Sequence, residues 1–446
     1  MIVEGAHVVT VTGQEYPDGH VVVDGNRITA VGAGRARDRA GHEVVDARGC
    51  QLTPGFVNTH HHLYQWVTRG LAVDATLFEW LTALYPVWAG IDEQAVRTGA
   101  SGALAQLALT GCTTAADHQY VFPREGGDVL GAEIQAAADV GLRFHATRGS
   151  MDLGRRDGGL PPDDVVEDRG EILAACEAAI DRWHDPSPDA MLRVALAPCS
   201  PFSVTGELMR ESAELARRRG VLLHTHLAET VDEEDYCRER FGCSPLEYVE
   251  ALGWTGEDVW FAHGVHFDDT EIKRVGATRT GVAHCPSSNA RLGAGIARTR
   301  DLRDAGARVG LGVDGAASNE AASLLEEARH AVLFARAVGG PTALTVRDGL
   351  ALATLGGAAI LGRESEIGSI EPGKLADLAL WRIDGFAHAD VADPVAALVL
   401  GAPPPLDLLL VDGCAVVEHG HVATVDTDTI ATECAVVHRT LLEKAR

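Results

Sequence analysis

The stretch LTPGFVNTHHH, residues 52–62, is an apolar run that ends in three consecutive histidines. Seven later stretches share this form, in which a short apolar run ends in polar or ionisable residues. About 36 residues separate one run end from the next, which suits one strand, one helix and two loops. The repeat predicts an α/β chain built on a (β/α)8 barrel of the TIM type, whose active-site face lies at the strand ends. The later stretches are CTTAADHQ, LRFHATRGS, LRVALAPCSPFS, VLLHTHLAET, VWFAHGVHF, GVAHCPSSN and VGLGVDGAASN.

The two ends of the chain have a different pattern. The first fifty residues contain short alternating runs, among them VVVDGNRITAV, where Asp-Gly-Asn predicts a hairpin turn. The same pattern of short alternating runs returns after about residue 365, and the final stretch TIATECAVVHRTLLEKAR predicts a terminal helix. We therefore predict a small β-sandwich domain, with its C-terminal helix, from residues 1–53 and 365–446, and the barrel from residues 54–364.

Composition narrows the class of protein. Lysine and arginine number 38 against 64 aspartates and glutamates, so the net charge is −26. Such a surface repels phosphate backbones, which disfavours nucleic acid and strongly anionic ligands and favours a small, weakly charged substrate. The nine cysteines are scattered without a CxxC pair, and no apolar run or leader pattern points to a membrane or to export. We expect a cytoplasmic protein.

The histidine triplet offers two ligands to one metal ion. On a strand, residues i and i+2 point to the same face, so His60 and His62 point together and His61 points away. His61 is therefore expected to be structural.

Later run ends offer further ligands of the same kind. His226 lies near the end of HTHLAET with Glu229 three residues on, His263 lies in FAHGVH, and Asp314 lies in GVDGAAS. Imidazoles and a carboxylate suit Zn²⁺ or Fe²⁺, with a position left for water. The order and spacing of these residues predict a metal-dependent hydrolase.

These motifs resemble the amidohydrolase superfamily, in the deaminase and chlorohydrolase branch that includes guanine deaminases and triazine hydrolases. The resemblance covers almost the whole chain and is carried by PGFVNTHHH, HTHLAET, AHGVHF, HCPSSNARL, GLGVDGAASN and IGSIEPGKLADLALW. A second set is similar to the bacterial 8-oxoguanine deaminases, a family within this branch. That set is NTHHHLYQ, LYPVWAGI, CTTAADHQYVFP, TRGSMDLGRRDGGLPP and LAPCSPFSVT.

The resemblance implies hydrolysis of the 2-amino group of 8-oxoguanine to urate and ammonia. It implies one Zn²⁺ per chain, although Fe²⁺ suits the same ligands. A lysine-bridged metal pair is excluded, because none of the three lysines ends an apolar run. The metal ligands implied are His60, His62, His226 and Asp314.

Proton transfers are expected from three residues. The resemblance implies that Glu229 and His263 handle protons. In the mechanism we expect, Asp314 takes a proton from the attacking water, Glu229 protonates the ring nitrogen, and His263 hydrogen-bonds the attacking oxygen. Asp314 or Glu229 then protonates the leaving ammonia.

Substrate contacts are predicted for Gln65, Cys199 and Trp88. The Gln65 amide offers a donor and an acceptor, which suits an amide-like purine edge. For Cys199 a pocket role and a plain buried position are equally open, and Trp88, with Tyr85, covers a planar ring or belongs to the core. His284 is expected to orient a ligand or the Asp314 loop rather than to touch substrate.

Several polar residues near these positions have two open interpretations. His224 is interpreted as packing or as support for a ligand. Asp117 and His118 are either a structural network or pocket contacts, and Ser287, Ser288 and Asn289 are expected to make loop hydrogen bonds.

Two rival functions stay open. The substrate could be another heterocycle, such as isoxanthopterin, guanine or a hydroxylated triazine. A non-catalytic scaffold that only oligomerises is disfavoured, because the chain keeps every ligand. The surface leaves room for a homo-oligomer.

Overall fold

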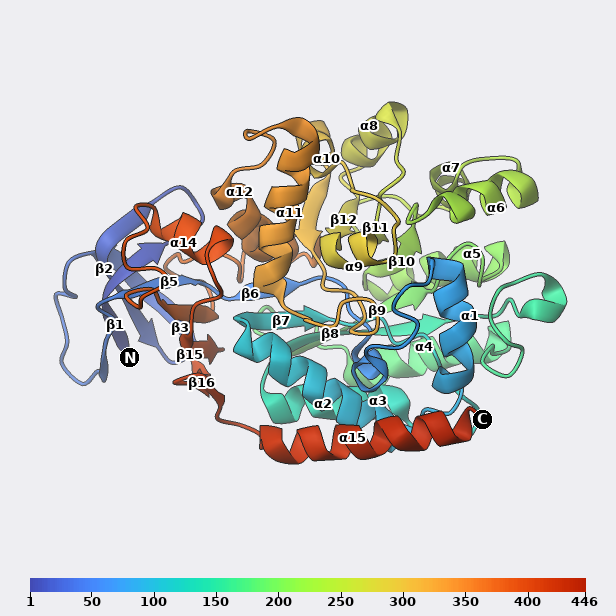
Figure 1. Cartoon of the computed structure of the whole chain (residues 1–446), viewed down its shortest axis with the longest axis horizontal. Helices are drawn as coiled ribbons and strands as arrows, with labels where there is room; N and C mark the ends of the chain where they lie inside the picture. The colour runs from blue at the N-terminus through green and yellow to red at the C-terminus, as the bar shows by residue number, and fades with distance from the viewer.

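Eight parallel strands close into a barrel in the computed structural model, which covers residues 1–446 (Figure 1). Each predicted apolar run supplies one strand, so the barrel is confirmed. Most of these strands are buried along their whole length, which is why they read as apolar runs without alternation. The strands are β6 (Phe56–Asn58), β7 (Cys112–Ala116), β8 (Arg143–Ser150), β9 (Leu192–Pro198), β10 (Leu223–Leu227), β11 (Val259–His263), β12 (Gly281–His284) and β13 (Arg308–Leu311).

Helices connect the barrel strands and surround them. Many begin at a side-chain cap, as where Asp92 accepts the backbone N–H of Ala95, and several end at a left-handed glycine such as Gly141. The largest core cluster, of 70 buried residues, packs mainly between these helices and the strands. The connecting helices are α2 (Glu93–Leu109), α3 (Val129–Val140), α4 (Arg169–Trp183), α5 (Gly206–Arg219), α6 (Val231–Phe241), α7 (Pro245–Ala251), α8 (Asp269–Ala277), α9 (Pro286–Arg291), α10 (Thr299–Ala305), α11 (Leu324–Gly339), α12 (Val346–Ala351) and α13 (Gly357–Ile360).

Both ends of the chain build a second, nine-stranded sheet, as predicted (Figure 1). Strand β5 joins the two ends, because it pairs in parallel with β1 and antiparallel with β14. The predicted hairpin is present, with Asp24 opposite Arg27 around Gly25. The strands are β1 (Ile2–Val9), β2 (Glu15–Asp24), β3 (Arg27–Ala33), β4 (Val44–Asp46), β5 (Cys50–Pro54), β14 (Leu378–Arg382), β15 (Leu406–Val411), β16 (Cys414–Glu418) and β17 (His421–Val422), and α14 (Pro394–Leu400) lies between β14 and β15.

The terminal helix α15 (Thr427–Lys444) forms as expected, but it packs on the barrel rather than on the terminal sheet. It runs along α2, away from the sheet (Figure 1). His438 Nδ1 lies 2.8 Å from the carbonyl oxygen of Val67, and Lys444 Nζ lies 3.1 Å from Asp92 Oδ2. None of the helices is both long and apolar enough to cross a membrane.

Two short elements after β6 help to cover the mouth of the barrel. The 3-10 helix η1 (Leu63–Thr68) carries Gln65, and α1 (Leu77–Trp88) begins with a capping box between Thr76 and Glu79. Both contribute side chains to the cavity described below.

Candidate metal centre and active site

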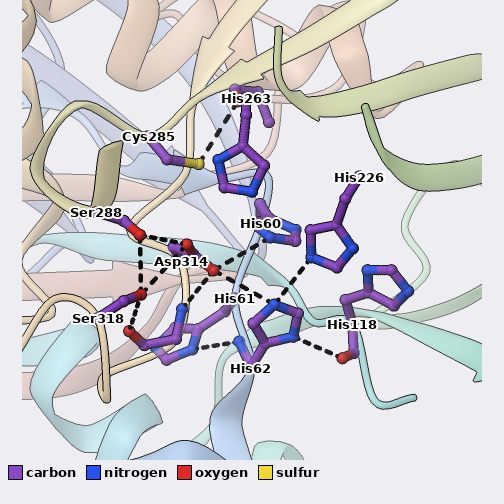
Figure 2. A network of polar contacts seen from close by, with 12 residues as sticks. His60, His61, His62, His118, His226, His263, Cys285, Ser288, Asp314 and Ser318 are labelled. Atoms are coloured by element: carbon purple, nitrogen blue, oxygen red, sulfur yellow. Dashed lines mark hydrogen bonds and ion pairs between the residues drawn. The ribbon is translucent and has the colours of Figure 1, made fainter. Parts of the chain in front are cut away.

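The four predicted metal ligands lie together: two of the histidines contact one oxygen of Asp314, and the third histidine contacts one of those two. Asp314 Oδ1 lies 3.3 Å from His60 Nε2 and 3.3 Å from His62 Nε2, and His62 Nε2 lies 3.1 Å from His226 Nε2 (Figure 2). The four residues come from the ends of three strands and the segments that follow them, at the C-terminal face of the barrel. All four side chains are buried.

The predicted reason for the His60–His62 pairing needs correction. Strand β6 ends at Asn58, so the triplet lies beyond the strand and strand alternation does not set its geometry. Instead, η1 begins directly after His62. His61 does point away from the other two, and its Nδ1 accepts the backbone N–H of His62 at 2.8 Å.

Outward hydrogen bonds fix the tautomers of His62 and His226. The Nδ1 of His62 lies 2.8 Å from the carbonyl oxygen of His118, and the Nδ1 of His226 lies 2.7 Å from the carbonyl oxygen of Cys199. A carbonyl oxygen only accepts, so each Nδ1 must carry the proton and donate. In the neutral rings, both Nε2 atoms therefore present lone pairs to the centre.

His60 is held in the same tautomer, with its proton on Nδ1, by a second histidine. His224 Nδ1 lies 3.0 Å from the carbonyl oxygen of Trp260, so it donates and leaves its Nε2 as an acceptor. His60 Nδ1 lies 2.8 Å from that Nε2 and must donate to it. The His60 Nε2 then also carries a lone pair, and His224 supports a candidate ligand rather than only filling space.

This donor set fits a divalent metal ion. Two Nε2 lone pairs at 3.1 Å cannot bond to each other and repel, unless a cation lies between them. Burial lowers the pKa of His226 to about 3 and also lowers the pKa of His62, so both rings stay neutral, as metal ligation requires.

His118 lies beside this centre. Its ring stacks on His226 with centroids 4.7 Å apart, and its Nε2 lies 2.9 Å from the carbonyl oxygen of Ala197. The ligand atoms of His60, His118 and His226 lie within 4.8 Å of one another, as do those of His60, His263 and Asp314. The structure therefore adds His118 as a neighbour of the predicted ligands.

Glu229 and His263 lie together at the edge of the centre. Glu229 Oε2 lies 3.5 Å from His263 Nε2, while His263 Nδ1 lies 2.9 Å from Asn289 Oδ1. Burial, and then the nearby charge of Asp314, raise the pKa of Glu229 well above its usual range. A protonated carboxyl group here can act as a general acid.

The backbone that carries Glu229 is held by a residue that the motifs do not reveal. Glu233 Oε1 accepts the N–H of Ala228 at 2.9 Å, and Glu233 Oε2 accepts the N–H of Glu229 at 3.1 Å. Ala228 has a φ of 53°, in the left-handed region that favours glycine. Glu233 therefore holds a strained turn, and its place in the first turn of α6 resembles an ordinary helix start.

A narrow cavity opens above the centre. Gln65 and Cys199 line it, which favours the pocket position for Cys199 over a plain core position, and both polar atoms of the Gln65 amide are buried without a partner. Trp80, Tyr85, Tyr120 and Phe202 are further wall residues, and the remainder are His62, Leu77, Leu81, His226, Glu229, His263, Leu292, Asp314 and Ser318.

Trp88 is not among the wall residues and is fully buried, which favours the core position over contact with substrate. Its ring packs behind the wall, 5.1 Å from Trp80 and 5.8 Å from Tyr85 between centroids. Its Nε1–H donates to Thr68 Oγ1 at 3.2 Å. Trp88 shares a face of α1 with Leu81 and Tyr85, but it is the last residue of the helix, so it differs from these wall residues in position along the helix axis rather than in direction.

The remaining polar residues whose role the sequence left open lie outside the cavity wall. His284 is buried outside the cavity wall, with its Nδ1 unpaired. Asp117 Oδ1 accepts the N–H of Leu63 at 2.6 Å, which favours the structural interpretation. Ser287 contacts His330, but Ser288 donates to Asp314.

The long connection between β8 and α4 lies close to the cavity. The N–H of Leu153 donates to the carbonyl of Ser203 at 3.2 Å, and that of Leu160 to Phe202 at 3.3 Å. Because Phe202 is a wall residue, this connection supports the wall from outside.

Comparisons with known proteins agree with this geometry. Residues 51–414 match the Amidohydrolase family. The chain is 47% identical to the 8-oxoguanine deaminase of Pseudomonas aeruginosa over 94% of each chain. It is 38% identical to the isoxanthopterin deaminase of an unknown prokaryotic organism, over 96% of this chain and 92% of the relative.

A solved structure shares the fold along nearly its whole length. The zinc complex of the atrazine chlorohydrolase TrzN from Arthrobacter aurescens TC1 superposes with a TM-score of 0.94, at 33% identity. The match covers 98% of this chain and 99% of that one. The barrel, the sheet from both ends and these matches agree: the chain belongs to the amidohydrolase family.

Proposed function

We propose that this enzyme is a mononuclear zinc deaminase that hydrolyses the 2-amino group of 8-oxoguanine to give urate and ammonia. The observation that carries the proposal is the convergence of three imidazole lone pairs and one carboxylate beneath a cavity whose wall includes a buried amide. Similarity to an 8-oxoguanine deaminase along almost the whole chain supports the choice of substrate.

His60, His62, His226 and Asp314 would hold the metal ion. When bound, a divalent ion of this kind lowers the pKa of a water ligand to about 7. The outward hydrogen bonds keep the three rings in the ligating tautomer, so the protein needs no rearrangement before it binds the ion.

The acid and base steps would fall to two carboxyl groups of the centre. Asp314 would accept a proton from the attacking water, and Asp314 or Glu229 would then protonate the leaving ammonia. Glu229, which burial keeps protonated, donates to the ring nitrogen next to the carbon under attack. His263 has its Nδ1 engaged with Asn289 and its Nε2 turned toward Glu229, so it can hold the attacking oxygen by a hydrogen bond.

The wall of the cavity suits a flat, uncharged ring. Trp80, Tyr85 and Tyr120 supply aromatic surface, and Gln65 supplies one donor pair and one acceptor to a purine edge. No lysine or arginine lines the cavity, so a phosphate group would find no cationic partner there. These features favour a free base over a nucleotide.

Isoxanthopterin is the second candidate substrate, because a relative 38% identical to this chain is named for it. It also presents a flat ring with an amide-like edge, which Gln65 could bind in the same way.

Turnover measurements separate the candidates. Purified protein is incubated with 8-oxoguanine, isoxanthopterin, guanine and a hydroxylated triazine, and ammonia is measured in each, with urate formation for the first. We expect the highest kcat/KM for 8-oxoguanine and about one equivalent of zinc per chain. A kcat/KM for another ring at least about tenfold higher, equivalent to about 1.4 kcal/mol, would replace the proposed substrate.

A further inference from the structure

The carboxylate of Asp314 is held by two serine hydroxyls on the side away from the histidines. Ser288 Oγ lies 2.6 Å from Asp314 Oδ2, and Ser318 Oγ lies 3.3 Å from the same oxygen (Figure 2). The other oxygen, Oδ1, faces His60 and His62 and accepts the N–H of Gly315 at 2.7 Å. The two oxygens of one carboxylate therefore have different partners.

From this geometry we infer that Ser288 is a positioning residue for the metal centre, which holds Asp314 so that Oδ1 alone faces the ion. The inference rests on the proposed metal site. It assigns Ser288 a task beyond the loop hydrogen bond expected from the sequence.

Among the contacts that join Ser288, Ser318 and Asp314, the hydrogen bond from Ser288 to Asp314 is the strongest. A hydroxyl has one proton, so Ser288 can donate to either Asp314 or Ser318, whose hydroxyl oxygen is 2.8 Å away. The contact to the carboxylate is shorter and is charge-assisted, which makes it the stronger choice. The Ser318 hydroxyl has a nearer acceptor in the carbonyl oxygen of Gly315, at 3.1 Å, so its contact to Asp314 at 3.3 Å is the weaker one.

Ser288 can act only through Asp314. It is fully buried and does not line the cavity, whereas Ser318 does. Asp314 itself has a φ of 63°, a left-handed conformation, so its side chain leaves the backbone at an unusual angle. A donor on the far oxygen limits rotation of the carboxylate about that strained position.

Helix α9 supplies a matched control next to this residue. Ser287 Oγ lies 2.7 Å from His330 Nδ1 and makes no contact with Asp314. Ser287→Ala and Ser288→Ala each remove one hydroxyl from adjacent positions of the same helix, but only the second removes a donor from the candidate ligand.

The test measures metal retention in full-length, zinc-loaded protein. Zinc affinity is measured by competition with a chromophoric chelator for the wild type, Ser288→Ala, Ser318→Ala and Ser287→Ala. The visible spectrum of each cobalt-substituted protein reports the ligand geometry, and thermal melting checks that each variant folds.

We expect Ser288→Ala to bind zinc about 10- to 100-fold more weakly and to shift the cobalt spectrum, as loss of a partner that orients a ligand typically does. Ser318→Ala should show a smaller change in the same direction, and Ser287→Ala none. If Ser288→Ala does not fold, Ser318→Ala carries the test.

The possible failures can be told apart. If the wild type binds zinc and a folded Ser288→Ala matches it in affinity and spectrum, the inference about Ser288 is wrong and the proposed function stands, whatever Ser318→Ala shows. If the wild type binds no zinc, the proposed metal centre is wrong and the inference falls with it.

Discussion

Replacing Glu229 by glutamine isolates the proposed acid from every other part of the centre. The substitution keeps the shape of the side chain and one carbonyl oxygen, but an amide cannot deliver a proton at neutral pH. Glu229 does not belong to the proposed ligand set, so metal binding should be unchanged. The variant therefore tests proton donation alone.

The expected loss is large. A positioned general acid contributes about 10²- to 10⁴-fold to the rate, so kcat should fall by that factor, or by about 3–5 kcal/mol in the activation barrier. KM should change little, because the amide occupies the same volume in the wall. The contact to His263 Nε2 at 3.5 Å can persist as a hydrogen bond from the amide.

Stability should move in the opposite direction to activity. Burial raises the pKa of Glu229 well above its usual range, so the native state holds a proton that the unfolded chain releases as the pH rises past about 4.3. Stability contributed by the protonated group is therefore lost as the pH rises toward the folded-state pKa. Glutamine has no such loss, so metal-free Glu229→Gln should be at least as stable as the wild type at neutral pH.

The assay combines steady-state kinetics with 8-oxoguanine, zinc content and urea unfolding of the metal-free protein. Glu234→Gln is the matched control, because Glu234 lies on α6 close by and pairs with Arg238 rather than with the centre. A Glu229→Gln enzyme that keeps its zinc and its kcat within about tenfold of the wild type would falsify the acid role, since this loss is below the range expected for such a group.

Other perturbations test separate parts of the structure. His226→Ala removes one of three converging imidazoles, and we expect zinc retention and turnover to be lost together; turnover without zinc would show that the site is misassigned. Gln65→Ala should raise KM for 8-oxoguanine with little change in zinc content, and an unchanged KM would remove Gln65 from substrate recognition. Two contacts of 3.1 Å between Arg143 and Asp377 join β8 to the terminal sheet. Arg143→Met leaves Asp377 as a buried charge without its partner, and we expect urea unfolding to show that the free energy of unfolding falls by about 3–5 kcal/mol. A loss below about 1 kcal/mol in that variant would mean that water or another group compensates Asp377.

Residues whose role depends on type and on position after an apolar run could be predicted. The sequence assigned His60, His62, His226, His263 and Asp314 to one site in this way, and the structure brings their side chains together. The reason is that parallel barrel strands bring their C-terminal ends to one face, so run ends far apart in the chain must meet. A site built from residues at these strand ends can therefore be predicted from the sequence.

The tasks of supporting residues could not be decided in this way. The sequence named Ser288 and His118 but left their tasks open, and it did not single out Glu233. Each has an ordinary local appearance: a helix-start serine, a histidine after a strand and a first-turn glutamate. Ser288 contacts Asp314, 26 positions away, and His118 contacts His62, more than 50 positions away. Glu233 contacts the backbone of Glu229 and Ala228, which are 4 and 5 positions before it. Spacing along the chain carries no record of such contacts.

Position along a helix is the second limit. The sequence offered Trp88 and Tyr85 as cover for a planar ring or as core, and of these two only Tyr85 lines the cavity, together with Trp80. All three share one face of α1, so periodicity does not identify which turn of that face borders a cavity.

By itself, the sequence determined the barrel, the sheet built from both ends and the type of centre, because burial and strand-end position leave a repeating pattern in the chain. Only the tertiary structure decided which nitrogen of each histidine faces inward, which oxygen of Asp314 is held by serine, and which aromatic rings form the wall. These depend on carbonyl groups and hydroxyls supplied by distant segments and on where each helix lies against the cavity. Such partners are set by packing in three dimensions, and the order of residues does not record them.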